Sequence, residues 1–354
     1  MTIALSMDQL ARPQPGGIAT YVRGLVSGLA SLGRCDVIGL APTGSHVANL
    51  EVALRRVPLR AEVLTYAWRY RAIGVPRGAA IVHATSMAGP FGGGRSDAVH
   101  SVALHDLLWR DEPDAATARG RRFHEQRLAL LMRRSDLRVF TSSPGLDDRL
   151  VDEGMDRSRL HPVRLGIDDR TEAAPPADVA RLLGRAGVAG PFTLYAGTRE
   201  PRKNLRRLVQ AHGIARSADA ALGPLVIVGP SGWGAVDVGD ATVLGPVARS
   251  MLRGLLRDAT VVAYVPLLEG WGLPPVEALA EGSRVVASTT TPSVATNGEV
   301  DLADPLDVDD IAATLRRAVA RSTSPDARAR RRASVSSLTW RQCALDHLAG
   351  WQCE

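Results

Sequence analysis

The chain has 354 residues, enough for about two domains, and its 45% apolar and 23% charged residues are the balance of a globular protein with a sizeable core. No apolar run reaches the ~20 residues of a membrane-spanning helix, and the first ten residues lack the pattern of a secretory leader. The three cysteines (Cys35, Cys343 and Cys353) argue against a disulfide framework or a cysteine metal site. We therefore expect a cytoplasmic protein. The net charge of +6 lies entirely in residues 1–166, which suits phosphates or an anionic membrane surface, while signatures of nucleic-acid binding are missing and no nucleic-acid partner is expected.

The first half of the chain alternates short apolar strands with helices. A strand at residues 3–6 leads into the loop Gly16-Gly17 and then into a helix whose apolar residues recur with helical spacing. A further helix is predicted over residues 121–134. The other predicted strands span residues 37–40, 79–84, 101–104 and 137–141. This alternation predicts a parallel, doubly wound sheet.

A second series of strands and helices follows a polar segment at residues 159–176, which we interpret as the inter-domain linker. Its predicted strands span residues 192–196, 225–228, 242–244, 260–265 and 284–288. Its predicted helices span residues 205–215, 248–256, 275–280 and 307–320. The Arg/Ser-rich residues 322–334 are interpreted as a solvated connector, and residues 339–348 as a last short helix. Two Rossmann-like halves are thus predicted, with ligands expected at the carboxyl ends of the strands, in the cleft between them.

The most specific motif is Glu269-Gly-Trp-Gly-Leu-Pro-Pro-Val-Glu277, which follows an apolar strand and enters a helix at Pro275. Backbone N–H groups of a glycine loop and of a helix start can bind phosphate or sugar oxygens. The two flanking carboxylates are acceptors suited to the diols of a sugar or a ribose. The alternative is that Glu277 is an ordinary first-turn helix acid and Glu269 a loop charge.

A second motif, Ala196-Gly-Thr-Arg-Glu-Pro-Arg-Lys-Asn204, lies between a strand end and a helix start. It gathers Arg199, Arg202 and Lys203 beside a glycine turn, where they could neutralise a diphosphate leaving group. Lys203 is the only lysine among 43 basic residues, so this position is a candidate for a compact ammonium group. Alternatively, Lys203 is an ordinary surface residue of a helix N-terminus, although the helix dipole disfavours a cation there.

In order and spacing, these two motifs resemble the family-4 (group 1) retaining glycosyltransferases of GT-B fold, and mannosyltransferases among them. Further matches extend the resemblance over nearly the whole chain: Gly16-Gly17-Ile18, Val82-His83-Ala84, His105-Asp106-Leu107, Gly245-Pro246-Val247, Arg284-Val-Val-Ala-Ser288 and Asp304-Pro-Leu-Asp307. The resemblance implies an α/β protein with two Rossmann-like, doubly wound domains facing each other across a cleft. Residues 1–166 would form the acceptor domain and residues 167–335 the nucleotide-sugar donor domain. A C-terminal helix within residues 336–354 would pack back toward the first domain.

The resemblance also assigns roles to single residues in the donor domain. It implies that Glu269 binds hydroxyls of the donor sugar and that Glu277 holds the ribose. Arg202 and Lys203 would bind the diphosphate. The remaining donor-binding residues that the resemblance implies are Gly16 and Gly17, which would close over the diphosphate, Gly197 of the diphosphate loop, Gly245 and Val247 of the base loop, and the amides of Gly270, Trp271, Gly272 and Leu273.

Two histidines of the first half receive different interpretations. By the resemblance, His105 faces the reacting sugar and is counted with Arg202, Lys203 and Glu269 as catalytic. Its place just after a strand fits a cleft residue, but a satisfied histidine that caps the strand is the alternative. His83 is interpreted as a core residue.

The resemblance implies a reaction that moves a hexose from a nucleoside-diphosphate sugar with retention of anomeric configuration. Leaving-group stabilisation by cations and amides would do most of the work, and a front-face reaction is the family expectation. No metal or other cofactor is expected, because the acidic doublets at residues 147–148, 168–169 and 309–310 lie in helix-start, linker or surface contexts and do not converge. Mannose is favoured over other hexoses. The acceptor, which could be a glycan, a lipid-linked molecule or a small molecule, is left open.

The sequence departs from the family pattern at two places. Many relatives carry arginine after the glycine of the diphosphate loop, where this chain has Thr198, so Arg199 or Arg202 would have to supply the charge. A glutamate that is frequent after the strand at residues 284–288 has no counterpart near residues 294–298. These departures motivate an alternative, a non-catalytic protein that binds nucleotide sugars.

Two further hypotheses come from single features. A lone lysine beside a phosphate loop could instead form a Schiff base with pyridoxal phosphate, as in GT-B phosphorylases. Residues 55–77 mix six arginines with Tyr66, Trp68 and Tyr70, a combination that suits peripheral contact with an anionic membrane or a lipid-phosphate acceptor. A solvated helix surface explains that segment nearly as well.

Overall fold

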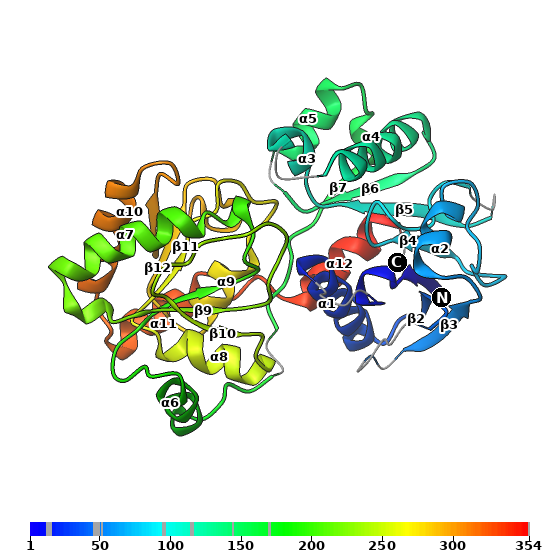
Figure 1. The fold of residues 1–354 in the computed structure, drawn as a ribbon. Coiled ribbons are helices and arrows are strands. Elements are labelled where there is room, and N and C mark those ends of the chain that lie inside the picture. Colours follow the sequence, from blue (N-terminus) through cyan, green and yellow to red (C-terminus); the bar gives the residue numbers. More distant parts are fainter. Residues whose placement is uncertain are drawn as a thin grey trace. The chain divides into compact units, whose positions relative to one another are not determined.

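The computed structural model describes residues 1–11, 16–44, 50, 52–93, 97–113, 117–143, 145–168 and 171–352. The chain forms two units, one made of Met1–Gly166 together with Leu338–Glu354 and the other of Ile167–Ser337. Figure 1 shows that each unit is a parallel sheet with helices on both sides. The predicted fold class, two Rossmann-like doubly wound α/β domains, is confirmed. No helix in the described ranges combines the length and the apolar character needed to cross a membrane.

The sheet of the first unit has seven parallel strands in the order β3-β2-β1-β4-β5-β6-β7. These are β1 (Thr2–Ser6), β2 (Asp36–Pro42), β3 (Ala53–Val57), β4 (Ile81–Ala84), β5 (Val99–Leu104), β6 (Arg138–Thr141) and β7 (Leu160–Pro162). β1 and β4 are nearly continuous apolar runs because both faces of a doubly wound sheet are covered. The strand order reverses between β1 and β4, the point at which such sheets usually bind ligands.

The helices of the first unit include one that comes from the far end of the chain. They are α1 (Gly17–Leu32), α2 (Ala61–Ala67), α3 (Leu108–Asp111), α4 (Ala118–Arg133), α5 (Leu146–Asp152) and α12 (Trp340–Gly350), with the short 3-10 helices η1 (Asp8–Ala11) and η3 (Arg157–Arg159). α12 packs directly on α1. A side chain at Gly24 would come within 2.0 Å of the Trp340 ring, and one at Gly28 within 2.1 Å of the Trp340 carbonyl oxygen. The two glycines therefore permit this close approach.

The sheet of the second unit has six parallel strands in the order β10-β9-β8-β11-β12-β13. These are β8 (Thr193–Ala196), β9 (Leu225–Val228), β10 (Thr242–Gly245), β11 (Val261–Tyr264), β12 (Val285–Ser288) and β13 (Val300–Ala303). The helices are α6 (Pro176–Arg185), α7 (Leu205–Ala218), α8 (Arg249–Asp258), α9 (Leu273–Ala280), α10 (Val308–Ala320) and α11 (Pro325–Ala333), with the 3-10 helices η4 (Pro201–Lys203), η5 (Ala220–Leu222) and η6 (Pro292–Val294).

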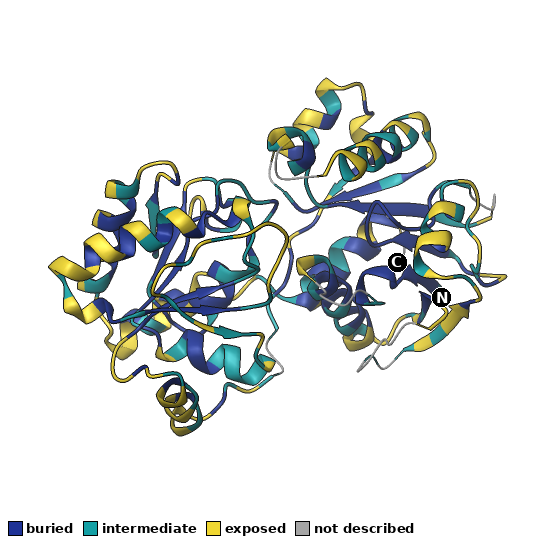
Figure 2. Ribbon diagram, in the orientation of Figure 1, coloured by how far each residue is buried: buried dark blue, intermediate teal, exposed yellow. Residues whose placement is uncertain are grey.

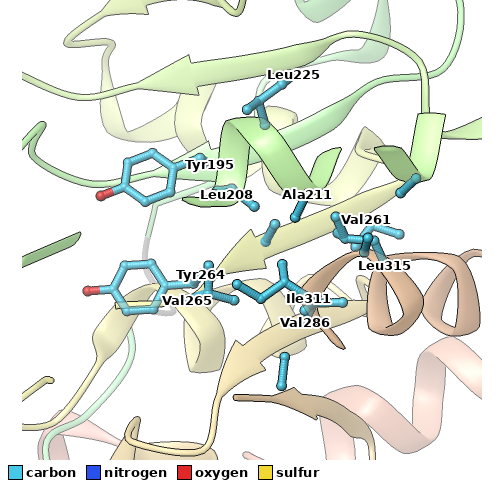
Figure 3. Packing of buried hydrophobic residues seen from close by; sticks show 14 of the residues in the cluster. Tyr195, Leu208, Ala211, Leu225, Val261, Tyr264, Val265, Val286, Ile311 and Leu315 are labelled. Carbon is cyan, nitrogen blue, oxygen red and sulfur yellow. The ribbon is translucent and has the colours of Figure 1, made fainter. Parts of the chain in front are cut away.

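The core of the second unit lies between its sheet and the helices α7 and α10, which pack on each other. Leu208, Ile311 and Leu315 are fully buried there. At the edge of this core, the rings of Tyr195 and Tyr264 are stacked with centroids 6.1 Å apart. Figure 3 shows both hydroxyl groups at the same end of the pair, away from the apolar side chains. Two neighbouring strands thus deliver polar groups to one edge of the sheet.

The interpretation of residues 322–334 as a solvated connector is wrong. Ser324 caps α11 by accepting a hydrogen bond from the Ala327 N–H, and Pro325 occupies the first turn. Arg331 is only 2% exposed, because its guanidinium donates to the carbonyl oxygens of Gly282 and Ser322 at 3.3 and 2.7 Å. The buried residues of this helix are Ala327 and Arg331, one turn apart, whereas most of the others are exposed (Figure 2).

A second arginine-rich helix, α4, also buries one of its arginines. Arg127 is 1% exposed, and its guanidinium lies 3.7 Å from the centre of the Phe91 ring. It donates to the carbonyl oxygens of Met87 and Gly89 at 2.7 and 2.6 Å. Burial and the nearby Arg69 lower the pKa of Arg127 to about 9. The side chain therefore holds the loop that follows β4.

Candidate functional site

Two loops meet at the carboxyl edge of the second sheet. β8 and β11 are adjacent parallel strands, so the segments that follow them emerge side by side. The Leu267 N–H donates to the carbonyl oxygen of Arg202 at 2.9 Å and joins the two segments directly. Asn204 supports the junction with a backbone φ of 60°, and its side-chain amide donates to the carbonyl oxygens of Val265 and Pro305 at 3.0 and 2.7 Å. The asparagine of the Arg-Lys-Asn motif therefore has a structural role that the sequence did not predict.

The predicted catalytic residues of this unit, Arg202, Lys203 and Glu269, form one compact group together with Tyr264, which we call the cation–carboxylate cluster. The Lys203 ammonium donates to the Tyr264 hydroxyl at 2.7 Å and to Oε2 of Glu269. Arg202 Nη1 donates to the other oxygen, Oε1 of Glu269, at 3.1 Å. Lys203 is 7% exposed, and the Glu269 side chain is 11% exposed. Each oxygen of the buried carboxylate thus faces a cation.

The electrostatics of the cluster favour the charged form of Glu269. Burial alone would raise the pKa of Glu269, but Lys203 and Arg202 outweigh burial and lower that pKa to about 2. Burial lowers the pKa of Lys203, and attraction to Glu269 opposes the change. Burial and the negative charge of Glu269 raise the pKa of Tyr264, so its hydroxyl keeps the proton that it donates to Glu269. Sequence reasoning missed Tyr264, because within an apolar strand it is indistinguishable from a core residue.

Arg202 is also bound to a second acid, and Arg199 points elsewhere. Arg202 Nε donates to Glu200 at 3.2 Å. The Arg199 guanidinium donates to the Ser231 hydroxyl in the loop that follows β9. Of the two arginines that were candidates to replace the arginine missing at Thr198, Arg202 is the one in contact with Glu269.

The glycine loop between the two glutamates has a conformation that requires glycine. Gly272 has a φ of +93°, and a Cβ there would lie 2.5 Å from Cγ2 of Thr291. Ser293 of η6 supports the loop, since its N–H donates to the Trp271 carbonyl oxygen at 2.9 Å and its hydroxyl to the Gly272 carbonyl oxygen at 2.6 Å. The segment where the family glutamate is missing therefore braces the loop. α9 begins directly after it at Leu273, two residues before the predicted start.

Glu277 lies in the interior of α9 and is 8% exposed. It is the fifth residue of the helix, so the alternative that it is an ordinary first-turn acid is wrong. Its Oε1 accepts a hydrogen bond from Arg249 Nη2 at 2.8 Å. Arg249 is the first residue of α8 and follows the predicted base loop of Gly245 and Val247 by two residues, so the base loop and the predicted ribose acid are neighbours.

Gly16, Gly17 and His105 belong to the first unit, and their predicted roles toward a donor bound by the second unit stay predictions. Gly16 caps α1, and neither it nor Gly17 has an atom within 4 Å of an added Cβ. His105 follows β5, with Nδ1 3.0 Å from the Ser142 hydroxyl and Nε2 3.2 Å from the Thr85 carbonyl oxygen. Burial lowers the pKa of His105 and favours the neutral ring. Both ring nitrogens have partners, which fits the alternative of a satisfied histidine.

The interpretation of His83 as a core residue is confirmed, because it is fully buried within a hydrogen-bonded series that we call the histidine chain: Ser101, His83, Tyr21 and His347. The Tyr21 hydroxyl lies 2.8 Å from Nε2 of His83 and 2.8 Å from Nε2 of His347. Nδ1 of His347 lies 2.7 Å from the carbonyl oxygen of Cys343, which can only accept, so His347 carries its proton on Nδ1 and accepts from Tyr21. The histidine chain holds α12 against the other elements of the first unit.

The described residues contain no group of three or more His, Cys, Asp or Glu side chains placed to hold a metal ion. Asp169, one member of the acidic doublets, lies outside the described residues. That the protein needs no metal or other cofactor stays a prediction.

Comparison with known proteins places the cluster in a family. The family model described as "Glycosyl transferases group 1" matches residues 190–321, all within the second unit. The chain is 33% identical over 191 residues to the O-antigen chain mannosyltransferase B of Escherichia coli, covering 50% of each protein. It is 29% identical over 229 residues to the MMP alpha-(1->4)-mannosyltransferase of Mycolicibacterium hassiacum, covering 60% of this chain and 52% of the relative. The chain therefore spans about half the length of these curated relatives.

Solved structures match over the full length at lower identity. A sucrose-phosphate synthase of Thermosynechococcus elongatus has a TM-score of 0.74 at 20% identity, over 99% of this chain and 98% of that one. HepE of Anabaena, solved in complex with UDP and glucose, has a TM-score of 0.74 at 16% identity, over 99% of both chains. These likenesses show the fold. The protein has the GT-B fold, and residues 190–321 of its second unit match the glycosyl transferases group 1 family.

Proposed function

We propose that the protein transfers a hexose, with mannose favoured, from a nucleoside-diphosphate sugar to a glycan, lipid-linked or small-molecule acceptor, with retention of anomeric configuration. The observation that carries the proposal is the cation–carboxylate cluster at the carboxyl ends of β8 and β11, inside the domain that matches the family. The two curated relatives are named mannosyltransferases. The structural neighbour from Anabaena holds UDP and glucose, which supports a nucleotide-sugar donor here.

The cluster can serve this reaction through its paired charges. Arg202 and Lys203 would stabilise the negative charge that develops on the departing diphosphate. Glu269 pairs with both cations in the structure, which avoids an unpaired charge in a nearly buried site. When the donor is bound, Glu269 would accept hydrogen bonds from its sugar hydroxyls, and the N–H groups at the start of α9 would face donor oxygens. The cations would then be shared between Glu269 and the diphosphate.

The acceptor step needs a base, and within the cluster Glu269 is occupied by two cations. We infer a front-face reaction in which the leaving phosphate helps to remove the acceptor proton. His105 would contact the reacting sugar from the first unit. In that state the neutral ring, favoured by burial, would exchange one of its present partners for a sugar hydroxyl.

The test is incubation of the purified protein with GDP-mannose, UDP-glucose and related nucleotide sugars, followed by detection of the released nucleoside diphosphate and of the glycoside. Nuclear magnetic resonance of the product gives its anomeric configuration, and retention is expected. Tight binding of a donor without transfer to any acceptor would favour the non-catalytic binding protein. A yellow protein whose colour borohydride fixes to Lys203 would favour pyridoxal-phosphate chemistry.

A further inference from the structure

Two arginines of α8, one helical turn apart, pair with Glu277 of α9 and with Glu281, the residue that caps the C-terminus of α9. Arg249 Nη2 donates to Oε1 of Glu277 at 2.8 Å, and Arg253 Nε donates to Oε1 of Glu281 at 2.5 Å. Both arginines also reach the segment that opens the second unit, Arg249 with Nε 3.4 Å from an oxygen of Asp168 and Arg253 with a hydrogen bond to the Thr171 carbonyl oxygen. Residues four apart share one face of a helix, so the two pairs form a ladder of matched geometry.

Only one of the two pairs lies at the predicted nucleotide site. Glu277 is the predicted ribose acid, and Arg249 opens α8 directly after the base loop. Within the described ranges, Oε1 of Glu277 is taken by Arg249, whereas Oε2 makes no hydrogen bond. The Glu277 side chain is 10% exposed and the Arg249 side chain 29% exposed. The carboxylate is thus held by one oxygen and leaves the other for a ligand.

We propose that Arg249 is a positioning residue for ribose recognition, an inference that rests on the proposed function of Glu277. Arg249 fixes the rotation of a nearly buried carboxylate, so that Oε2 is aimed to accept the hydroxyl groups of the nucleotide ribose. Asp168 orients the arginine in turn through its Nε. Without Arg249, this carboxylate would lose the cation that it pairs with among the described residues and could rotate toward water. That rotation removes the acceptor that the ribose needs.

The experiment compares nucleotides with and without ribose hydroxyls on the full chain. Dissociation constants of GDP and UDP, and of their 2′,3′-dideoxy analogues, are measured by calorimetry for the wild type, Arg249→Met, Arg249→Lys and Arg253→Met. A hydrogen bond to a charged group corresponds to about a tenfold preference for the ribose form, which we expect in the wild type. Arg249→Met should reduce that preference to less than about threefold, and Arg249→Lys should restore part of it.

Arg253→Met is the matched control, because it breaks the same kind of pair one turn away and leaves Glu277 untouched. It should keep the full ribose preference while losing a similar amount of thermal stability. If Arg249→Met does not fold, Arg249→Lys takes its place in the comparison. A full ribose preference in the Arg249 variant, or tighter ribonucleotide binding than in the wild type, overturns the inference. A wild type that binds neither nucleotide, or binds ribose and dideoxy forms equally, overturns the ribose role of Glu277 itself.

Discussion

The two units place polar groups in their interiors in opposite ways. In the second unit, the cation–carboxylate cluster brings full charges together, with Glu269 between Lys203 and Arg202. In the first unit, the histidine chain uses neutral rings and hydroxyl groups. Burial lowers the pKa of His83, and it lowers the pKa of His347 to about 4. Neutral groups satisfy one another completely, whereas paired charges retain an attraction for other charged groups.

The contrast indicates that the histidine chain stabilises the fold, whereas the cation–carboxylate cluster is suited to binding a charged ligand. The histidine chain links α1, β4, β5 and α12 within one unit by hydrogen bonds between neutral groups, as a structural network requires. In the cluster, Lys203 and Arg202 pair with Glu269, and Arg202 also pairs with Glu200, so an incoming diphosphate can exchange with these carboxylates as the partner of the two cations. We expect substitutions in the cation–carboxylate cluster to lower activity most. Substitutions in the histidine chain should lower stability alone.

The largest expected effect on activity comes from substitution of Lys203, the lysine of the cation–carboxylate cluster. Lys203→Ala removes one of two charges available to the leaving group and should lower kcat by about 1000-fold. The measurement is the rate of nucleoside-diphosphate release from the best donor. Arg181→Ala, which breaks the exposed pair with Asp178, serves as the control and should leave the rate unchanged. A Lys203→Ala enzyme with wild-type kcat would remove Lys203 from the site.

Glu269→Gln should be the most damaging change for stability. It leaves the nearly buried Lys203 facing a neutral amide, while Arg202 keeps Glu200, and breaking such a buried pair costs about 3 kcal/mol of unfolding free energy. Urea unfolding at neutral pH measures the loss, with Arg181→Ala again as the reference. An unchanged midpoint would show that the cluster is not coupled to folding.

Glu269→Gln also tests how the free energy of unfolding depends on pH. Since the pKa of Glu269 is lowered to about 2 in the folded protein, its ionised form stabilises the fold above its ordinary pKa of about 4.3, and this contribution disappears as the pH falls toward 2. The stability difference between wild type and Glu269→Gln should therefore shrink between about pH 4 and pH 2. A difference that stays constant over this window would contradict the ion pairing.

In the histidine chain, Tyr21→Phe tests whether a substitution can lower stability without lowering activity. It removes one hydroxyl between two buried imidazoles and should cost about 2 kcal/mol, while the kcat of the folded protein stays the same. Thermal unfolding and donor turnover are measured together. Tyr66→Phe removes an exposed hydroxyl and should change neither quantity. A large loss of kcat in Tyr21→Phe would mean that the chain also takes part in the reaction, for instance through the ring contact of Tyr21 with His105.

The smallest effect concerns the proposed contact of the first unit with anionic membranes. Tyr66 and Tyr70 near α2 are 64% and 58% exposed, and Arg60 and Arg71 beside them are exposed as well. Each arginine near a charged surface contributes about 1 kcal/mol, so Arg71→Ser should weaken sedimentation with phosphatidylserine vesicles by about fivefold. Neutral phosphatidylcholine vesicles are the control. Equal binding to both vesicle types, or to neither, would contradict the contact.

Much of the fold could be predicted because parallel strands covered on both faces are short continuous apolar runs, as in Leu225–Val228. The edge strand β3 was missed, because Arg55 and Arg56 face solvent and interrupt the apolar pattern. The helix α11 was misinterpreted because its arginines satisfy their charge with backbone carbonyl oxygens, a partnership that composition does not reveal.

The candidate site was predictable where a motif is local and was missed where partners come from distant segments. Lys203 and Glu269 were recognised from motifs, and the structure brings them into contact. Tyr264 looks like a core residue of an apolar strand until its hydroxyl is seen beside Lys203. Arg249 gave no signal, since its pairing with Glu277 spans 28 residues and depends on how α8 and α9 lie together.

The position of α12 has a consequence for the order in which the protein matures. Tyr21 receives its partner His347 from 326 residues further along the chain, and Trp351 donates to Ser101 across 250 residues. The second unit, in contrast, is continuous in sequence. During synthesis it can complete its core while the first unit, translated earlier, still waits for its last helix to leave the ribosome. A truncation just before Trp340 should therefore spare the second unit and leave the first with an open seam along Gly24 and Gly28.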